Sequence, residues 1–126
     1  MKDVTNKEIT LPQPVSAFVR AVNDRDPDAF LATFTSDAVV ADVGQEFRGT
    51  AAIKKWADRE IFSVNVTLDV MVAADRDGQT IVTVEVDGTF DKTGLPDPLL
   101  LEHYFTVEGG KITSFSSRLA GEKPGR

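Results

Sequence analysis

The sequence predicts a single α+β domain in which helices pack on one face of a mostly antiparallel β-sheet. Three observations lead to this fold class. The chain has 126 residues, 41% of them hydrophobic, which suits one globular domain with its own core. Apolar residues recur with a helical period in the first half of the chain and alternate with a strand period in the second half. Helices followed by a run of strands are typical of an α+β domain.

Two helices are expected near the amino terminus. Residues 1–13 are interpreted as a flexible lead-in, because the prolines at positions 12 and 14 stop a helix from extending backwards. The first helix covers residues 14–24. The second opens at Asp26, which can cap the helix, and Pro27 takes its first position. The apolar stripes of the two helices are Val15, Phe18, Val19 and Val22, and then Phe30, Leu31 and Phe34.

A short strand and a third helix come next. Residues 38–43 are expected to form a strand in which Val40 and Asp42 share one face. An aspartate between valines either ends the strand in water or faces an enclosed pocket, where its carboxylate is useful as a base. Gly44 and Gly49 bracket a connection to a helix over residues 50–62, which Thr50 would cap and whose stripe is Ile53, Trp56, Ala57 and Ile61.

Alternation of apolar and polar residues then predicts strands over residues 64–72 and 81–90. An apolar run predicts a third strand over residues 99–107, and the tight turn after it predicts a closing strand over residues 111–119. Residues 91–98 form a loop, and Glu108 begins a tight turn with two glycines. The strand 99–107 is the most apolar of the four. Alternation puts Leu100, Glu102, Tyr104 and Thr106 on one face, and Leu99, Leu101, His103, Phe105 and Val107 on the other.

Composition narrows the function. A net charge of −6 without a Lys/Arg cluster argues against a nucleic-acid or anionic-membrane partner. With no cysteine and one histidine, neither disulfides nor a transition-metal site is expected, and no cofactor is implied. No apolar run is long enough to span a membrane, and the first residues do not resemble a signal peptide, so a cytoplasmic location is expected. Residues 14–120 then form the domain, and residues 121–126 a loose tail.

Four stretches carry a family resemblance: AVNDRDPDAFLATFTSDAVVADVG, RGTAAIKKW, EHYFTVEGGKI and LAGEK. On these stretches, the chain from Val15 to Lys123 resembles the nuclear transport factor 2-like superfamily, and within it the ketosteroid isomerase and SnoaL-like cyclase group. The resemblance implies a cone-shaped fold with three N-terminal helices packed on a curved sheet. It also implies a homodimer. The fold hosts many chemistries, so the resemblance alone does not fix an activity.

The resemblance also implies roles for particular residues. Asp42 matches the aspartate that shuttles a proton between carbons of a steroid, and Glu102 matches the protonated acid of the oxyanion hole. Phe18 stands where the family places a tyrosine donor, and Ala57 where it places a second tyrosine. Because a principal hydrogen-bond donor of the oxyanion hole is missing, efficient steroid isomerisation is not expected. A related reaction and simple ligand capture both stay open.

These inferences define a candidate site and two functions. Asp42 and Glu102 are expected to form an acidic pair, one ionised and one protonated, in a pocket lined by Phe18, Phe34, Trp56, Tyr104 and Phe115. The pocket would bind a small hydrophobic ligand of steroid or polyketide type, with proton transfer next to a carbonyl. The alternative is a non-catalytic ligand-binding or dimerisation domain of the same fold.

The sequence also suggests where a second subunit would bind. The strand face that carries Leu99, Leu101, His103 and Phe105 has no evident covering helix, and an uncovered apolar face of this size usually meets a partner. His103 is accordingly expected at a subunit interface or at the edge of the core, on the face opposite Glu102.

Overall fold

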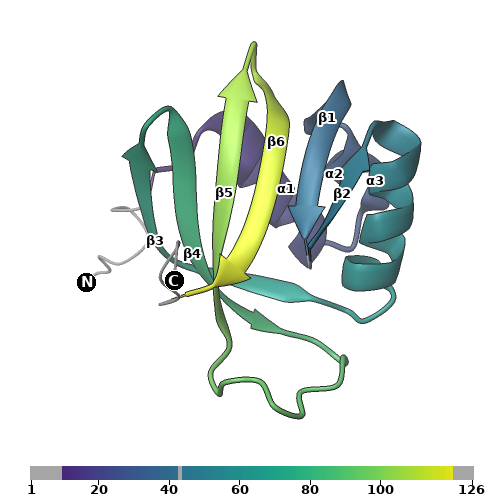
Figure 1. The fold of residues 1–126 in the computed structure, drawn as a ribbon, viewed down its shortest axis with the longest axis vertical. Coiled ribbons are helices and arrows are strands. Elements are labelled where there is room, and N and C mark those ends of the chain that lie inside the picture. Colours follow the sequence, from purple (N-terminus) through teal and green to yellow (C-terminus); the bar gives the residue numbers. More distant parts are fainter. Residues whose placement is uncertain (1–9, 43, 121–126) are drawn as a thin grey trace.

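The helices pack against one face of a curved, unclosed six-stranded sheet (Figure 1). The computed structural model describes residues 10–42 and 44–120. Most of the expected lead-in and all of the expected tail therefore lie outside the described residues. The strand order is β2-β1-β6-β5-β4-β3. Because β2 and β3 are at opposite edges, the sheet does not close on itself, and the α+β fold class predicted from the sequence is confirmed.

The helices begin close to their predicted positions. Helix α1 spans Gln13–Asn23, and α2 spans Pro27–Leu31, where the Asp26 side chain accepts a hydrogen bond from the Ala29 amide at 3.1 Å. The α2 helix ends earlier than expected, so Phe34 belongs to a strand. Helix α3 spans Thr50–Ala57 and continues as a π-helical turn, η2, over Asp58–Phe62.

The start of α3 differs from the prediction in two respects. The cap residue is Gly49, not Thr50, and Gly49 has a φ of 89°, which a glycine adopts without strain. The helix also follows two strands, so the three helices do not all precede the sheet.

The sheet contains the four predicted long strands and two more segments around Asp42. Antiparallel pairing joins all neighbours except β1 and β6, which run parallel. Strand β2 was not predicted because its sequence, QEFR, has no apolar alternation; it is held by pairing with β1. The strands are β1 Phe34–Asp42, β2 Gln45–Arg48, β3 Thr67–Arg76, β4 Gln79–Asp87, β5 Leu100–Glu108 and β6 Lys111–Leu119.

Phe18 of α1 lies at the centre of the core. Its ring centroid is 5.0 Å from that of Phe105 on β5, 5.2 Å from that of Phe115 on β6 and 4.9 Å from that of Phe30 on α2. Phe105 is only 1% exposed. The expectation that the face of β5 bearing Phe105 is free for a second subunit is therefore wrong, because α1 covers it.

Within the described residues, no helix combines the length and the apolar character that crossing a membrane requires.

Candidate active site

A pocket of about 180 Å³ opens between the inner face of the sheet, helix α1 and the α3–η2 segment. Most of its lining is apolar, and besides the indole N–H of Trp56 four side chains bring polar atoms: Asp42, Glu60, His103 and Ser117. This combination of apolar walls and a few polar groups is typical of a small-molecule site. The remaining lining residues are Phe18, Val22, Trp56, Ile61, Val66, Leu68, Val86, Phe90, Leu99, Leu101 and Phe115.

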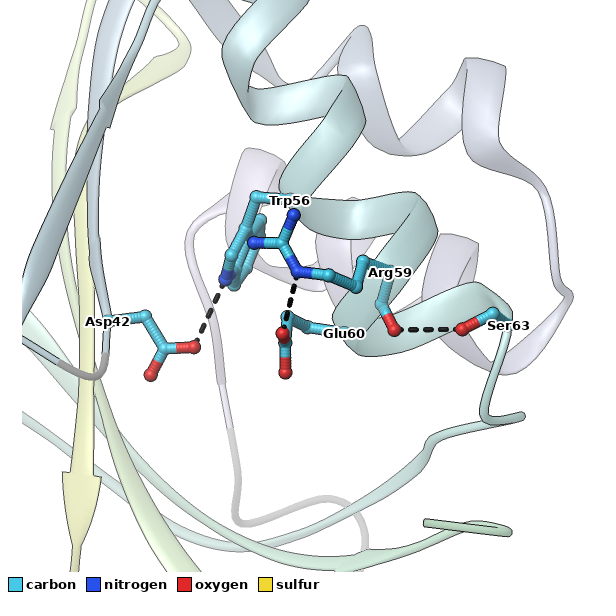
Figure 2. Close-up of polar contacts among 5 residues, drawn as sticks. All are labelled: Asp42, Trp56, Arg59, Glu60 and Ser63. Atoms are coloured by element: carbon cyan, nitrogen blue, oxygen red, sulfur yellow. Dashed lines mark hydrogen bonds and ion pairs between the residues drawn. The ribbon is translucent and has the colours of Figure 1, made fainter.

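Asp42 is the last residue of β1, and its side chain lies on the pocket face together with buried Val40, as the alternation predicted. The indole nitrogen Nε1 of Trp56 donates a hydrogen bond to Oδ2 of Asp42 at 3.0 Å (Figure 2). Trp56 is 3% exposed, so its ring is fixed by packing. A donor held in this way fixes the orientation of the carboxylate.

Glu60 brings a second carboxylate to the pocket from η2, on the side opposite β1 (Figure 2). Nε of Arg59 donates to Oε2 of Glu60 at 2.9 Å, and the Arg59 guanidinium lies 5.8 Å from the centre of the Phe47 ring. The Ser63 hydroxyl donates to the Arg59 carbonyl at 2.8 Å. Since the Arg59–Glu60 pair is exposed, it shapes the charge at the pocket mouth and adds little to stability.

His103 of β5 lines the inner part of the pocket and is only 6% exposed. The centre of its ring lies 4.9 Å from the ring centre of Phe115 and 6.2 Å from the ring centres of Phe18 and Phe105. Burial among these rings lowers the pKa of His103 to about 3, so the imidazole is neutral near pH 7. Among the described residues, no group forms a hydrogen bond with the imidazole, and Ser117 is its cross-strand neighbour on the pocket face.

The structure corrects the placement of Glu102 and Tyr104, which lie on the outer face of the sheet. There the Tyr104 hydroxyl donates to Oε1 of Glu102 at 2.8 Å, and this hydrogen bond raises the pKa of Tyr104. The Arg118 guanidinium lies 4.7 Å from the centre of the Tyr104 ring. The predicted acidic pair of Asp42 and Glu102 is therefore not formed.

A shift of one residue along β5 explains this difference, because it exchanges the two faces of a strand. The resemblance aligned Glu102 with the pocket, although Leu101 and Phe105 are the more apolar residues and belong to the core side. That apolar alternation was the signal by which His103 could have been found.

The aromatic residues expected in the pocket are divided between the pocket, the core and, for Tyr104, the outer face of the sheet. Phe18, Trp56 and Phe115 line the pocket. Phe34 does not line the pocket. The centre of its ring lies 5.4 Å from the ring centre of Phe30 and 6.1 Å from that of Phe18, within the core. Glu60 and Phe90 were missed because they lie on an irregular helical turn and a loop, where periodicity gives no orientation. Across the described stretches 10–42 and 44–120, no three His, Asp or Glu side chains are arranged to hold a metal ion.

Residues 15–115 match the SnoaL-like domain model. The chain belongs to the SnoaL-like domain family. This confirms the resemblance to the nuclear transport factor 2-like and ketosteroid isomerase-like superfamily. No curated protein is significantly similar in sequence.

Solved structures with the same fold include two proposed polyketide cyclases. One, from Sinorhizobium meliloti, is 27% identical, with a TM-score of 0.76 over 86% of this chain and 95% of that chain. Another, from Xanthomonas campestris, is 28% identical, with a TM-score of 0.68 over 82% and 85%. A Mycobacterium tuberculosis protein in complex with estradiol-17β-hemisuccinate is 17% identical, with a TM-score of 0.68 over 86% and 93%, and at this identity it shows the fold alone.

Proposed function

We propose that this SnoaL-like protein binds a small, mostly apolar carbonyl compound in the pocket and transfers a proton at the carbon next to the carbonyl. The observation that carries the proposal is the pairing of a carboxylate and a neutral imidazole in one apolar pocket. Asp42 is fixed there by Trp56, and His103 has no hydrogen-bond partner among the described residues. A base and a hydrogen-bond donor facing one cavity are the two groups that enolisation requires.

Asp42 acts as the base. Among the described residues, Trp56 forms the one hydrogen bond to its side chain, and this bond uses Oδ2. The other oxygen, Oδ1, takes a proton from the carbon next to the carbonyl, and the electrons of that C–H bond move into an enolate. With a β,γ-unsaturated ketone, Asp42 returns the same proton to the γ carbon. The product is the conjugated isomer, and no net proton is gained or lost.

His103 acts as the donor to the enolate oxygen. Because burial keeps the imidazole neutral, it presents one N–H group and carries no charge that would pair with Asp42. It supplies the hydrogen bond that the resemblance assigned to Glu102. Donors of this kind contribute about 10² to 10³ in rate when they are aimed at the developing oxyanion.

The charges at the site favour an uncharged ligand over an anion. Asp42 and Glu60 both line the pocket, whereas Arg59 is engaged by Glu60 and Phe47. A carboxylate ligand would bring a like charge next to Asp42, which is unfavourable in an apolar site. The names of two of the structural neighbours, proposed polyketide cyclases, support a carbonyl compound as the ligand.

Binding without turnover is the second candidate function, and one observation favours it. Glu102 lies outside the pocket and Phe18 has no hydroxyl, so neither oxyanion donor implied by the resemblance is present. The same pocket would then hold its ligand by apolar contact and by hydrogen bonds to His103 and Ser117.

Asp42→Asn separates the two functions. The assay follows conversion of 3-cyclohexen-1-one to its conjugated isomer, with binding measured in parallel. We expect the parent protein to catalyse the conversion and the variant, which keeps the shape of the side chain but not its basicity, to lose at least about 10²-fold in kcat. Equal turnover by both proteins would exclude Asp42 as the base, and binding without turnover by the parent would establish the second function.

We also propose a homodimer, with a different interface from the one expected from the sequence. The helices lie on the inner face of the sheet (Figure 1), whereas the outer face carries half-buried side chains that include Ile81, Leu100 and Tyr104. Glu102 and Arg118 are cross-strand neighbours on this face. With the twofold axis passing between Glu102 and Arg118, the Glu102 carboxylate of each subunit would lie near the Arg118 guanidinium of the other.

A further inference from the structure

We propose that the ligand has one or two rings, and that Phe90 sets this limit by closing one side of the pocket. The inference rests on the proposed function, since it concerns the ligand of the same site. The pocket volume of about 180 Å³ is the first observation. Pockets for drug-sized ligands measure about 300–1,000 Å³, and a cavity of about 150 Å³ holds benzene. A four-ring steroid therefore exceeds the space, whereas a cyclohexanone or a decalone suits it.

Phe90 reaches the pocket from the segment between β4 and β5, not from a regular strand or helix. Two backbone hydrogen bonds tie down this segment: the Thr89 amide donates to the Val64 carbonyl at 2.7 Å, and the Val86 amide donates to the Leu99 carbonyl at 2.9 Å. Phe90 follows Thr89 directly, so the hydrogen bond of Thr89 positions the backbone from which the Phe90 ring reaches the pocket.

Lys92 holds the ring from the solvent side. Its ammonium group donates to the Gly88 carbonyl at 2.6 Å and lies 3.2 Å from the Asp87 carboxylate. The same Nζ atom is 5.1 Å from the centre of the Phe90 ring, within the range of a cation–π contact. The ring is thus enclosed between the pocket and a lysine that two other groups hold in position.

Gly88 makes this arrangement sterically allowed. A Cβ atom at this position would lie 2.7 Å from the Val64 carbonyl oxygen and 2.9 Å from the Phe90 ring. Both distances are shorter than van der Waals contact, so any larger residue would have to move the backbone or the ring. Glycine therefore lets the loop approach Val64, in the connection between η2 and β3, closely enough for Phe90 to close the pocket.

The other aromatic walls are less suited to setting ligand size. Phe18 and Phe115 are in the centre of the core, with rings packed on several sides, and their removal would open the core itself. Phe90 is half-buried and sits at the edge. Phe90 packs against the outside of the core cluster, so we expect its replacement to enlarge the pocket on the loop side with less disturbance of the core than replacement of Phe18 or Phe115.

The test uses Trp56, the only tryptophan of the chain, as a fluorescent reporter in the pocket wall. Parent protein, Phe90→Ala and Leu95→Ala are titrated with cyclohexanone, 2-decalone and a four-ring 3-ketosteroid. Leu95 is the matched control, because it lies on the same loop, is 39% exposed and does not line this pocket. Phe90→Leu is a smaller change that keeps the test available if the alanine variant does not fold.

For the parent and for Leu95→Ala, we expect binding of the two smaller ketones and at least tenfold weaker binding of the steroid. In Phe90→Ala, steroid affinity should rise at least tenfold, while cyclohexanone affinity changes less than about threefold. Lys92→Gln should shift the preference in the same direction by a smaller factor.

Three results would overturn the proposal. A parent protein that binds the steroid as tightly as cyclohexanone has no such size limit, although the proposed function would stand. Unchanged steroid affinity in a folded Phe90→Ala protein would show that another wall sets the limit. A parent protein that binds none of the three ketones would contradict the proposed function itself, and with it this inference.

Discussion

Replacing His103 with leucine should remove most of the acid sensitivity of this fold between about pH 7 and about pH 5. The imidazole is surrounded by the rings of Phe18, Phe105 and Phe115, and burial lowers its pKa from 6.5 to about 3. In the unfolded chain the same side chain would titrate near its ordinary value of about 6.5.

The sign of the effect follows from proton binding. Because the pKa is lower in the folded state, the unfolded chain binds more protons between about pH 6.5 and about pH 3, and stability falls as the pH falls through this window. At about pH 5 the unfolded histidine is almost fully protonated and the folded one is not, which corresponds to a loss of about 2 kcal/mol relative to about pH 7.

The assay is urea denaturation followed by circular dichroism at both pH values, for the parent and for His103→Leu. Packing changes caused by the substitution are present at both pH values and cancel in the comparison. The carboxylates contribute equally to the two proteins. We expect the free energy of unfolding to fall by about 2 kcal/mol more in the parent than in the variant. The same pH dependence in both proteins would refute the conclusion that His103 is held neutral by burial.

Two further predictions concern the oxyanion site and the outer face of the sheet. Phe18→Tyr adds a hydroxyl to a pocket-lining ring whose centroid is 6.2 Å from that of His103, and we expect turnover of 3-cyclohexen-1-one to rise about tenfold. Unchanged or lower turnover would show that this ring edge does not face the carbonyl. Tyr104→Glu adds a second acid beside Glu102 on the proposed interface, and sedimentation at micromolar concentration should detect a shift from dimer to monomer. Lys55→Glu, on the exposed side of α3, is the control, and a parent protein that is already monomeric would contradict the interface.

The elements with a clear period could be predicted from the sequence. The stripe of α1, the strict alternation in β4 and the placement of Asp42 on the same face as Val40 all follow from local patterns. These patterns hold because one face of each element is buried and the other is not. The four stretches that resemble known proteins also predicted the family, and the match to the SnoaL-like domain model confirms it.

The inner end of the site was not predicted, for a physical reason. Both faces of β5 carry large side chains, so burial does not distinguish Tyr104 from Phe105 as sharply as it distinguishes residues on an ordinary surface strand. The resemblance to the family placed Glu102 in the pocket. A shift of one residue along the strand exchanges its two faces, so the pocket contains His103 in place of Glu102. The position of Phe90 depends on the hydrogen bond between Thr89 and Val64 and on the contact of Lys92 with the Phe90 ring. Hydrophobic periodicity along the sequence does not predict contacts of this kind.

The measurement that tests the central claim most directly is the exchange of the α-hydrogens of cyclohexanone with deuterium in D₂O, followed by NMR. This reaction needs only a base and a donor in the pocket and does not depend on the natural substrate. We expect the parent protein to accelerate exchange and Asp42→Asn to lose that acceleration while still quenching or shifting Trp56 fluorescence on binding. Exchange at the same rate in both proteins would contradict the assignment of Asp42 as the base.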